Sequence, residues 1–204
     1  MPVSRGAGLL VVHPSLPVKS VPELIAHVNS NPGKVTMASA GIGSAPHMFW
    51  ELFRNVTKVN MVHVPYRGGG PAVTDLLAGQ VMSYFATMAS GAEHVKVGKL
   101  RGLAITSASR TPVLPDVPAM AEFLPGYEAS IFVGISAPKG TPAEIVERLN
   151  REVNAGFADP KLQKRIADLG DLPLKMSAAE FGKLANDEVE KWAKVIQSAN
   201  IRAE

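Results

Sequence analysis

Short apolar segments alternate with amphipathic segments along the first 107 residues, and this alternation constrains the fold more than any other feature. The segments expected to form strands are 9–12, 34–39, 59–64, 81–87 and 100–107. The segments expected to form helices between them are 21–30, 45–54 and 71–77. Strands separated by helices of about ten residues indicate a mostly parallel sheet with helices on its faces. The sequence therefore predicts an α/β fold.

The second half of the chain is poor in strands. Residues 111–125 contain four prolines and are expected to be mostly a connection, and 131–137 is the one expected strand after them. Helices are then expected at 142–158, 161–169 and 177–199, with N-terminal caps at Thr141 and Ser177. Three helices and one strand cannot close an α/β domain, so we expect these helices to pack on strands from elsewhere.

Composition excludes several classes of protein. The chain has 204 residues and no cysteine, which removes disulfide frameworks, thiolate metal sites and cysteine nucleophiles. The net charge is only +3 and no basic block concentrates it, which argues against nucleic acid as a partner. No apolar run is long enough to span a bilayer. The apolar run at 9–12 is too short for a signal peptide, so we expect no export signal in the chain as given.

The densest group of functional candidates lies at 38–47, with the sequence Ala-Ser-Ala-Gly-Ile-Gly-Ser-Ala-Pro-His. A strand leads into a loop of small residues, and Ser44 is expected to cap the following helix. Glycines let the backbone approach a ligand, and free N–H groups at a helix start favour an anion such as a carboxylate. A tight turn without a ligand is an equally open interpretation. Pro46 excludes the dinucleotide fingerprint, and the spacing around Ser44 excludes a nucleophile elbow.

Two further strand ends and the histidines complete the candidates. The loop at 64–71 holds three glycines but lacks phosphate-loop spacing, and Thr87 ends the next expected strand. Ligands in open α/β sheets collect at the carboxyl ends of strands, so these ends favour a binding crevice. None of the five histidines has metal-site spacing. Only His47 is a candidate site residue, because it is expected in the first helical turn beside the proposed anion site. Ser44 with His47 suggests a hydrolase only weakly, because no Asp lies nearby in sequence to orient the imidazole.

Six ordered motifs together resemble one family. They lie at 14–20, 38–47, 64–68, 98–104, 114–118 and 137–142. This set resembles the Bug family, the periplasmic solute-binding receptors of tripartite tricarboxylate transporters. The resemblance implies a two-lobed, type II periplasmic-binding-protein-like fold that captures small organic carboxylates. It also implies delivery to the membrane components of a transporter, a periplasmic location, no cofactor and no catalysis.

The resemblance also implies how the chain is divided. Family members begin with a strand–loop–helix unit that is not found here, so the chain looks N-terminally truncated. Residues 1–12 would be a crossing strand, and 13–130 a complete ligand-binding lobe, lobe two. Residues 131–204 would then be a return strand and the C-terminal helices of an incomplete lobe one. Such a remnant is expected to self-associate.

The family pattern assigns five residues to the ligand loop and two further residues to less central positions of the pocket. These are Ser39, Gly41, Gly43, Ser44 and His47, followed by Gly68 and Thr87. Backbone N–H groups around Gly43 to Ala45 would hold a carboxylate. Two alternatives stay open: a remnant that binds no ligand, and an esterase-like hydrolase that uses Ser44 and His47. Which carboxylate is bound cannot be read from these residues, because backbone donors accept any carboxylate.

Overall fold

The computed structural model describes residues 1–202, and all seven of the strands in this range belong to one sheet. Five strands have the order β3-β2-β4-β1-β5, and two more pair with β1. The bounds are β1 (Pro2–Val12), β2 (Thr36–Ser39), β3 (Val62–Pro65), β4 (Ser83–Thr87), β5 (Arg101–Ile105), β6 (Ser130–Gly134) and β7 (Asp171–Pro173).

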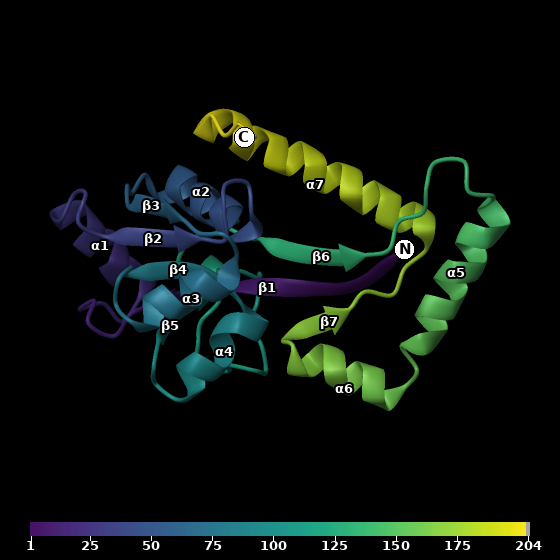
Figure 1. The fold of residues 1–204 in the computed structure, drawn as a ribbon, viewed down its shortest axis with the longest axis horizontal. Helices are drawn as coiled ribbons and strands as arrows, with labels where there is room; N and C mark the ends of the chain where they lie inside the picture. The colour runs from purple at the N-terminus through teal and green to yellow at the C-terminus, as the bar shows by residue number, and fades with distance from the viewer. Residues whose placement is uncertain (203–204) are drawn as a thin grey trace.

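Strand β1 connects two parts of the molecule: a larger part that contains β2 to β5 and a smaller part that contains β6 and β7. Its C-terminal half pairs antiparallel with β4 and β5, and Gly8 lies opposite Thr87. Its N-terminal half pairs antiparallel with β6 and β7, and Ala7 lies opposite Ser130. Figure 1 shows this half extending from the larger part toward the smaller one. Strand β2 is parallel to both β3 and β4, but β1 is antiparallel to every strand it pairs with. The sheet is therefore mixed, and the expectation of a mostly parallel sheet was only partly right.

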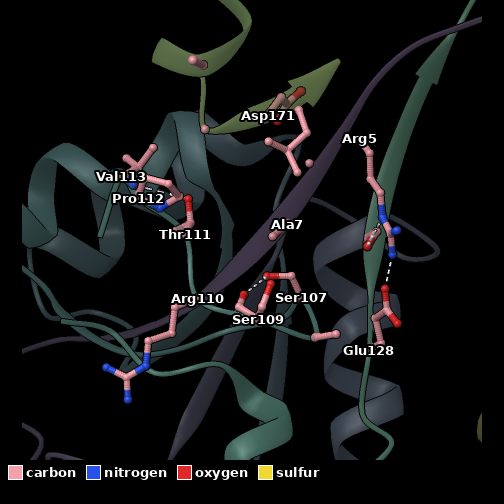
Figure 2. A pocket seen from close by; sticks show the side chains of 16 residues that line it. Arg5, Ala7, Ser107, Ser109, Arg110, Thr111, Pro112, Val113, Glu128 and Asp171 are labelled. Carbon is pink, nitrogen blue, oxygen red and sulfur yellow. Dashed lines mark hydrogen bonds and ion pairs between the residues drawn. The ribbon is translucent and has the colours of Figure 1, made fainter. Parts of the chain in front are cut away.

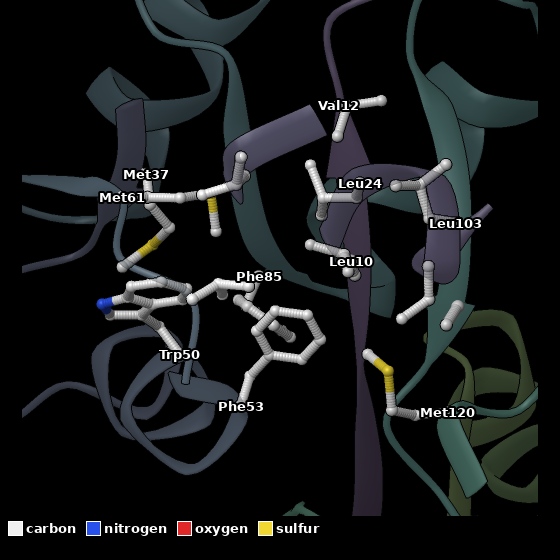
Figure 3. Close-up of a cluster of buried hydrophobic side chains, with 14 of the residues drawn as sticks. Leu10, Val12, Leu24, Met37, Trp50, Phe53, Met61, Phe85, Leu103 and Met120 are labelled. Carbon is white, nitrogen blue, oxygen red and sulfur yellow. The ribbon is translucent and has the colours of Figure 1, made fainter. Parts of the chain in front are cut away.

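Helices cover both faces of the larger part. They are α1 (Val21–Ser30), α2 (Ala45–Thr57), α3 (Gly69–Leu77) and α4 (Met88–Lys96). Successive β1 side chains point to opposite faces, so Leu10 and Val12 join one core and Leu9 and Val11 the other. Figure 3 shows the first core, to which Leu10 and Phe53 both belong. Strands β2 and β4 likewise contribute side chains to both cores.

The C-terminal helices are more exposed than α1 to α4, each of which buries at least three residues. They are α5 (Ala143–Gly156), α6 (Pro160–Asp168) and α7 (Ala178–Ala199), preceded by a short 3₁₀ helix, η1 (Met120–Glu122). Helix α5 has no buried residue, and α7 buries only Val195. Helix α7 runs along β6 toward α2 (Figure 1), where the rings of Trp192 and Phe49 lie 6.1 Å apart. The Oγ atom of Ser198 accepts a hydrogen bond from Asn55 at 2.6 Å.

Most expected elements are present, but several boundaries and caps were wrong. Helix α4 and strand β7 were not expected, so two strands rather than one follow residue 125. Strand β7 has three residues and exists because it pairs with β1, a contact without a local sequence signal. Thr141 does not cap α5, because its hydroxyl donates to the Pro138 carbonyl. Ser177 does form the expected capping box with Glu180.

In the described part of the chain, no helix combines the length and apolarity that crossing a membrane requires.

Candidate functional site

Three neighbouring strands end at one edge of the sheet, and each leads into a helix. Strand β2 leads through the loop 40–44 into α2, β3 leads into α3, and β4 leads into α4. The three strands are parallel, so their carboxyl ends and the helix N-termini lie at the same edge. The structure therefore brings Ser39, Gly68 and Thr87 to one side of the larger part, as the sequence predicted.

The loop before α2 is folded tightly on itself. The Ser44 hydroxyl and the Ser44 N–H both donate to the Gly41 carbonyl, at 2.6 and 3.2 Å. Gly41 has a φ of +123°, and a Cβ there would lie 3.3 Å from the carbonyl oxygen of Tyr66. The expectation that the Ser44 side chain caps α2 was wrong. Its hydroxyl instead closes the loop by bonding to a carbonyl, which leaves the helix start without a side-chain cap.

The uncapped start of α2 presents free donors. The Gly43 N–H donates to His47 Nδ1 at 3.1 Å, so the ring proton of a neutral His47 lies on Nε2. Among the acceptors of residues 1–202, none is bonded to the N–H groups of Ala45 and His47. These two groups lie at the positive end of the α2 dipole. The arrangement favours an anion, and a carboxylate can accept both hydrogen bonds.

A buried polar network supports the loop from behind. Ser39 is fully buried, accepts a hydrogen bond from the Gly41 N–H at 3.2 Å, and lies 2.7 Å from His63 Nε2. The ring of His63 stacks on that of His47, with centroids 4.2 Å apart. Ser39 is thus engaged inside the protein, where it fixes the loop. His63 was not a sequence candidate, and only the pairing of β2 with β3 brings it here.

The far side of His47 faces a buried carboxylate. Glu51 is 4% exposed, and its Oε1 lies 3.5 Å from His47 Nε2. Its Oε2 lies 3.1 Å from Arg54 Nε, but the Arg54 N–H is not directed at it. That oxygen therefore has no hydrogen bond from any described residue. Glu51 and Arg54 set the charge environment around the imidazole pair.

The other two helix starts differ from α2. Gly68 precedes α3 without a side-chain cap, and the neighbouring Tyr66 hydroxyl donates to Asp75 at 2.7 Å. Burial and this bond to Asp75 raise the pKa of Tyr66 to about 12. Thr87 caps α4 by accepting a hydrogen bond from the Ser90 N–H at 3.2 Å. The Thr87 side chain is therefore occupied at the helix start, while Gly68 leaves its helix start open.

An apolar cavity of about 340 Å³ adjoins the loop. Gly43 and Ala45 form part of its wall. The rest comes mainly from apolar side chains of α2, β6, α7 and the residues after α7: Met48, Phe49, Ile131, Trp192, Ile196 and Ile201. This cavity shares its wall with the segment that carries the free N–H donors.

A second cavity, of about 270 Å³, follows β1 between the segment after β5 and strand β7 (Figure 2). Arg5 lies at its edge and pairs with Glu128 and with Ser130 Oγ. Asp171 accepts a hydrogen bond from Ser4 at 2.8 Å, and Arg110 points away from the cavity in Figure 2. The charged groups at this cavity are thus bound to protein partners, unlike the donors at the start of α2.

The geometry does not support nucleophilic catalysis. The Ser44 hydroxyl is bonded to Gly41, while His47 Nδ1 accepts from Gly43 and its Nε2 faces Glu51. Ser44 and His47 are therefore each bonded elsewhere and do not form a nucleophile–base pair. Among residues 1–202, no group of three or more His, Asp or Glu side chains is placed to hold a metal ion.

Helix starts gathered at the carboxyl edge of an α/β lobe, joined to a smaller part by a long strand, define a periplasmic-binding-protein-like architecture. The family model described as "Tripartite tricarboxylate transporter family receptor" (TctC) matches residues 1–201. The chain therefore belongs to the TctC family of receptors.

Solved structures agree with this assignment. Rpa4515 of Rhodopseudomonas palustris, solved with adipate, is 33% identical with a TM-score of 0.90 over 98% of this chain and 68% of its own. MatC of the same organism, solved with bound malate, is 30% identical with a TM-score of 0.86 over 96% of this chain and 69% of its own. The periplasmic binding protein BugD has a TM-score of 0.88 at 32% identity. BugD is thus a periplasmic binding protein, and the other two structures were solved with a small carboxylate.

Two curated relatives are longer than this chain. A UPF0065 protein of Pseudomonas sp. strain P51 is 36% identical over 96% of this chain and 59% of its own length. BugT of Bordetella pertussis is 35% identical over 95% of this chain and 60% of its own length. The chain thus spans about three fifths of these two relatives.

Proposed function

We propose that this chain is the carboxylate-binding portion of an extracytoplasmic receptor that serves a tripartite tricarboxylate-type transporter. The observation that carries the proposal is the pair of unbonded N–H groups, those of Ala45 and His47, at the start of α2. Family membership supports it, as do the adipate and malate bound by two structural neighbours. The receptor would deliver its ligand to the membrane components of the transporter.

Each site residue has a part in this proposal. The segment from Gly43 to His47 receives the carboxylate, and Gly41 and Ser44 hold the loop closed behind it. Ser39 fixes the base of the loop through His63. Gly68 and Thr87 border the ligand from the neighbouring helix starts. No cofactor and no metal ion take part.

The division of the chain is part of the same proposal. Residues 1–12 cross between two lobes, 13–130 form the complete binding lobe, and 131–204 belong to a lobe that is incomplete in this chain. Pairing of β1 with strands of both parts supports the crossing role. The incomplete lobe is proposed to mediate self-association.

Nuclear magnetic resonance with ¹⁵N-labelled protein tests the carboxylate site directly. Titration with adipate and malate is expected to shift the amide signals of Ala45 and His47 with saturation. Amides of α1, such as that of Ala26, serve as the internal control and should not move. A folded chain whose Ala45 and His47 signals stay in place with both acids and with a monocarboxylate such as hexanoate would overturn the proposal and favour a remnant without ligand.

A further inference from the structure

The apolar cavity beside α2 continues from the segment that would hold the carboxylate. Gly43 and Ala45 belong to both, and the Ala45 N–H is one of the two free donors. A Cβ built on Gly43 would meet no atom within 4 Å, so the backbone borders open space there. A single small molecule can therefore reach both the helix start and the cavity.

The side chains of this cavity offer little to a second polar group. The Trp192 indole N–H donates to Glu188 at 2.8 Å, and Ser130 Oγ accepts a hydrogen bond from Arg5 at 3.0 Å. The remaining side chains of the wall are aliphatic, aromatic or thioether. A polar group buried here would lose its bonds to water without replacement, which is unfavourable.

We propose that the cavity takes the hydrocarbon part of the ligand, so that this chain selects monocarboxylates with an apolar chain or ring. This rests on the proposed function, because the carboxylate end is held at the start of α2. The cavity volume of about 340 Å³ lies near the lower end of ordinary ligand pockets, which run from about 300 to 1,000 Å³. It fits a small acid and excludes a large lipid.

A series of acids tests the proposal on the full chain. Acetate, butyrate and hexanoate present the same carboxylate with increasing apolar length, and adipate matches hexanoate but carries a second carboxylate. Dissociation constants come from the Ala45 amide shift. Affinity is expected to rise about fourfold for each buried methylene, and hexanoate is expected to bind more than tenfold tighter than adipate. Affinity independent of chain length, or tighter binding of adipate, would overturn the proposal.

Two variants locate the apolar contact. Ile196→Ser changes the cavity wall, and Ile145→Ser is the matched control on α5, outside the cavity and similarly exposed. Ile196→Ser should remove most of the advantage of hexanoate over acetate, and Ile145→Ser should preserve it. Equal loss in both variants would contradict the assignment to this cavity.

Failure of this inference differs from failure of the proposed function. If acetate and hexanoate shift the Ala45 and His47 amides with equal affinity, the carboxylate site stands and the apolar cavity has no role. If no acid of the series shifts these amides, both proposals fall. The ligand series needs no variant, so a misfolded variant does not remove the test.

Discussion

The imidazole rings of His47 and His63 stack 4.2 Å apart and within 7° of parallel. The stack joins α2 to β3, and each ring also holds one end of the loop between β2 and α2. His47 accepts a hydrogen bond from Gly43, and His63 lies 2.7 Å from the Ser39 hydroxyl oxygen. The loop that bears the candidate site is therefore fixed by two side chains that lie behind it.

Stability is expected to fall as the pH is lowered, because His63 resists protonation in the folded state. Burial is the main cause that lowers its pKa from 6.5 to about 4; the charge of His47 lowers it further, Glu51 opposes the shift, and Arg54 adds the smallest lowering. Between these values the unfolded chain binds a proton that the folded chain does not. The free energy of unfolding therefore decreases as the pH falls from about 6.5 to 4.

The variant His63→Gln isolates this contribution. We expect wild type to lose about 1–2 kcal/mol more than His63→Gln between about pH 7 and pH 4.5, since partial exposure reduces the full value. Urea unfolding at several pH values measures the difference. His27→Gln, on α1, is the control and should follow wild type. Parallel pH curves for wild type and His63→Gln would contradict the prediction.

Gly43→Val is expected to weaken hexanoate binding more than tenfold, or about 1.4 kcal/mol. Gly43 has a φ of +74°, which a β-branched residue strongly disfavours, so the loop would move away from the helix start. Gly33→Val is a close control, because Gly33 has a φ of +73° and equal free space around its Cβ position. Both variants should lose stability, and only Gly43→Val should lose affinity. Equal affinities in the two folded variants would refute the role of this loop.

Ser44→Ala is expected to lower the free energy of unfolding by about 1 kcal/mol through loss of the bond to the Gly41 carbonyl. Thermal unfolding monitored by circular dichroism measures the change. Hydrolysis of an activated ester should be the same background rate in wild type and variant, because Ser44 has no base beside it. Turnover that disappears in Ser44→Ala would restore the hydrolase interpretation.

Local sequence signals predicted the elements better than the contacts between them. Helix α1 has the expected bounds because Ser20, Pro22 and Glu23 mark its start within a few residues. Strand β7 had no such signal, because its three residues are held by β1, far away in sequence. Helix α4 was missed because Ser90 and Gly91 are poor helix formers that burial against β1 and β4 compensates.

At the candidate site too, the sequence predicted the local structure better than the contacts between side chains. The glycine and serine pattern at 38–47 correctly indicated a tight loop before a helix. The pattern did not show where the Ser44 hydroxyl would point, because a nearby carbonyl and an N–H of the helix compete for it. Nor could it show that His63 supports His47, since that contact depends on the pairing of β2 with β3.

The exposed apolar side chains of the smaller part lead to the last prediction. Val189 and Leu172 are each 67% exposed, and Ile145 and Leu149 on α5 are 46% and 44% exposed. Large apolar patches are rare on soluble monomers and usually mark association. We expect the chain to self-associate through residues 131–204, while 13–130 stay compact and resist protease.

Sedimentation velocity at micromolar concentration tests this, together with limited proteolysis. The double variant Ile145→Lys/Leu149→Lys should shift the chain toward monomer, because a buried ammonium in the contact is costly. Val56→Lys/Val97→Lys changes two valines of the larger part that are 47% and 63% exposed, at least as much as Ile145 and Leu149, and should leave association unchanged. A wild-type monomer whose C-terminal third resists protease would mean that these helices are stable where they lie, α7 against α2, α6 against β7 and α5 against α7, and that their exposed side chains need no partner.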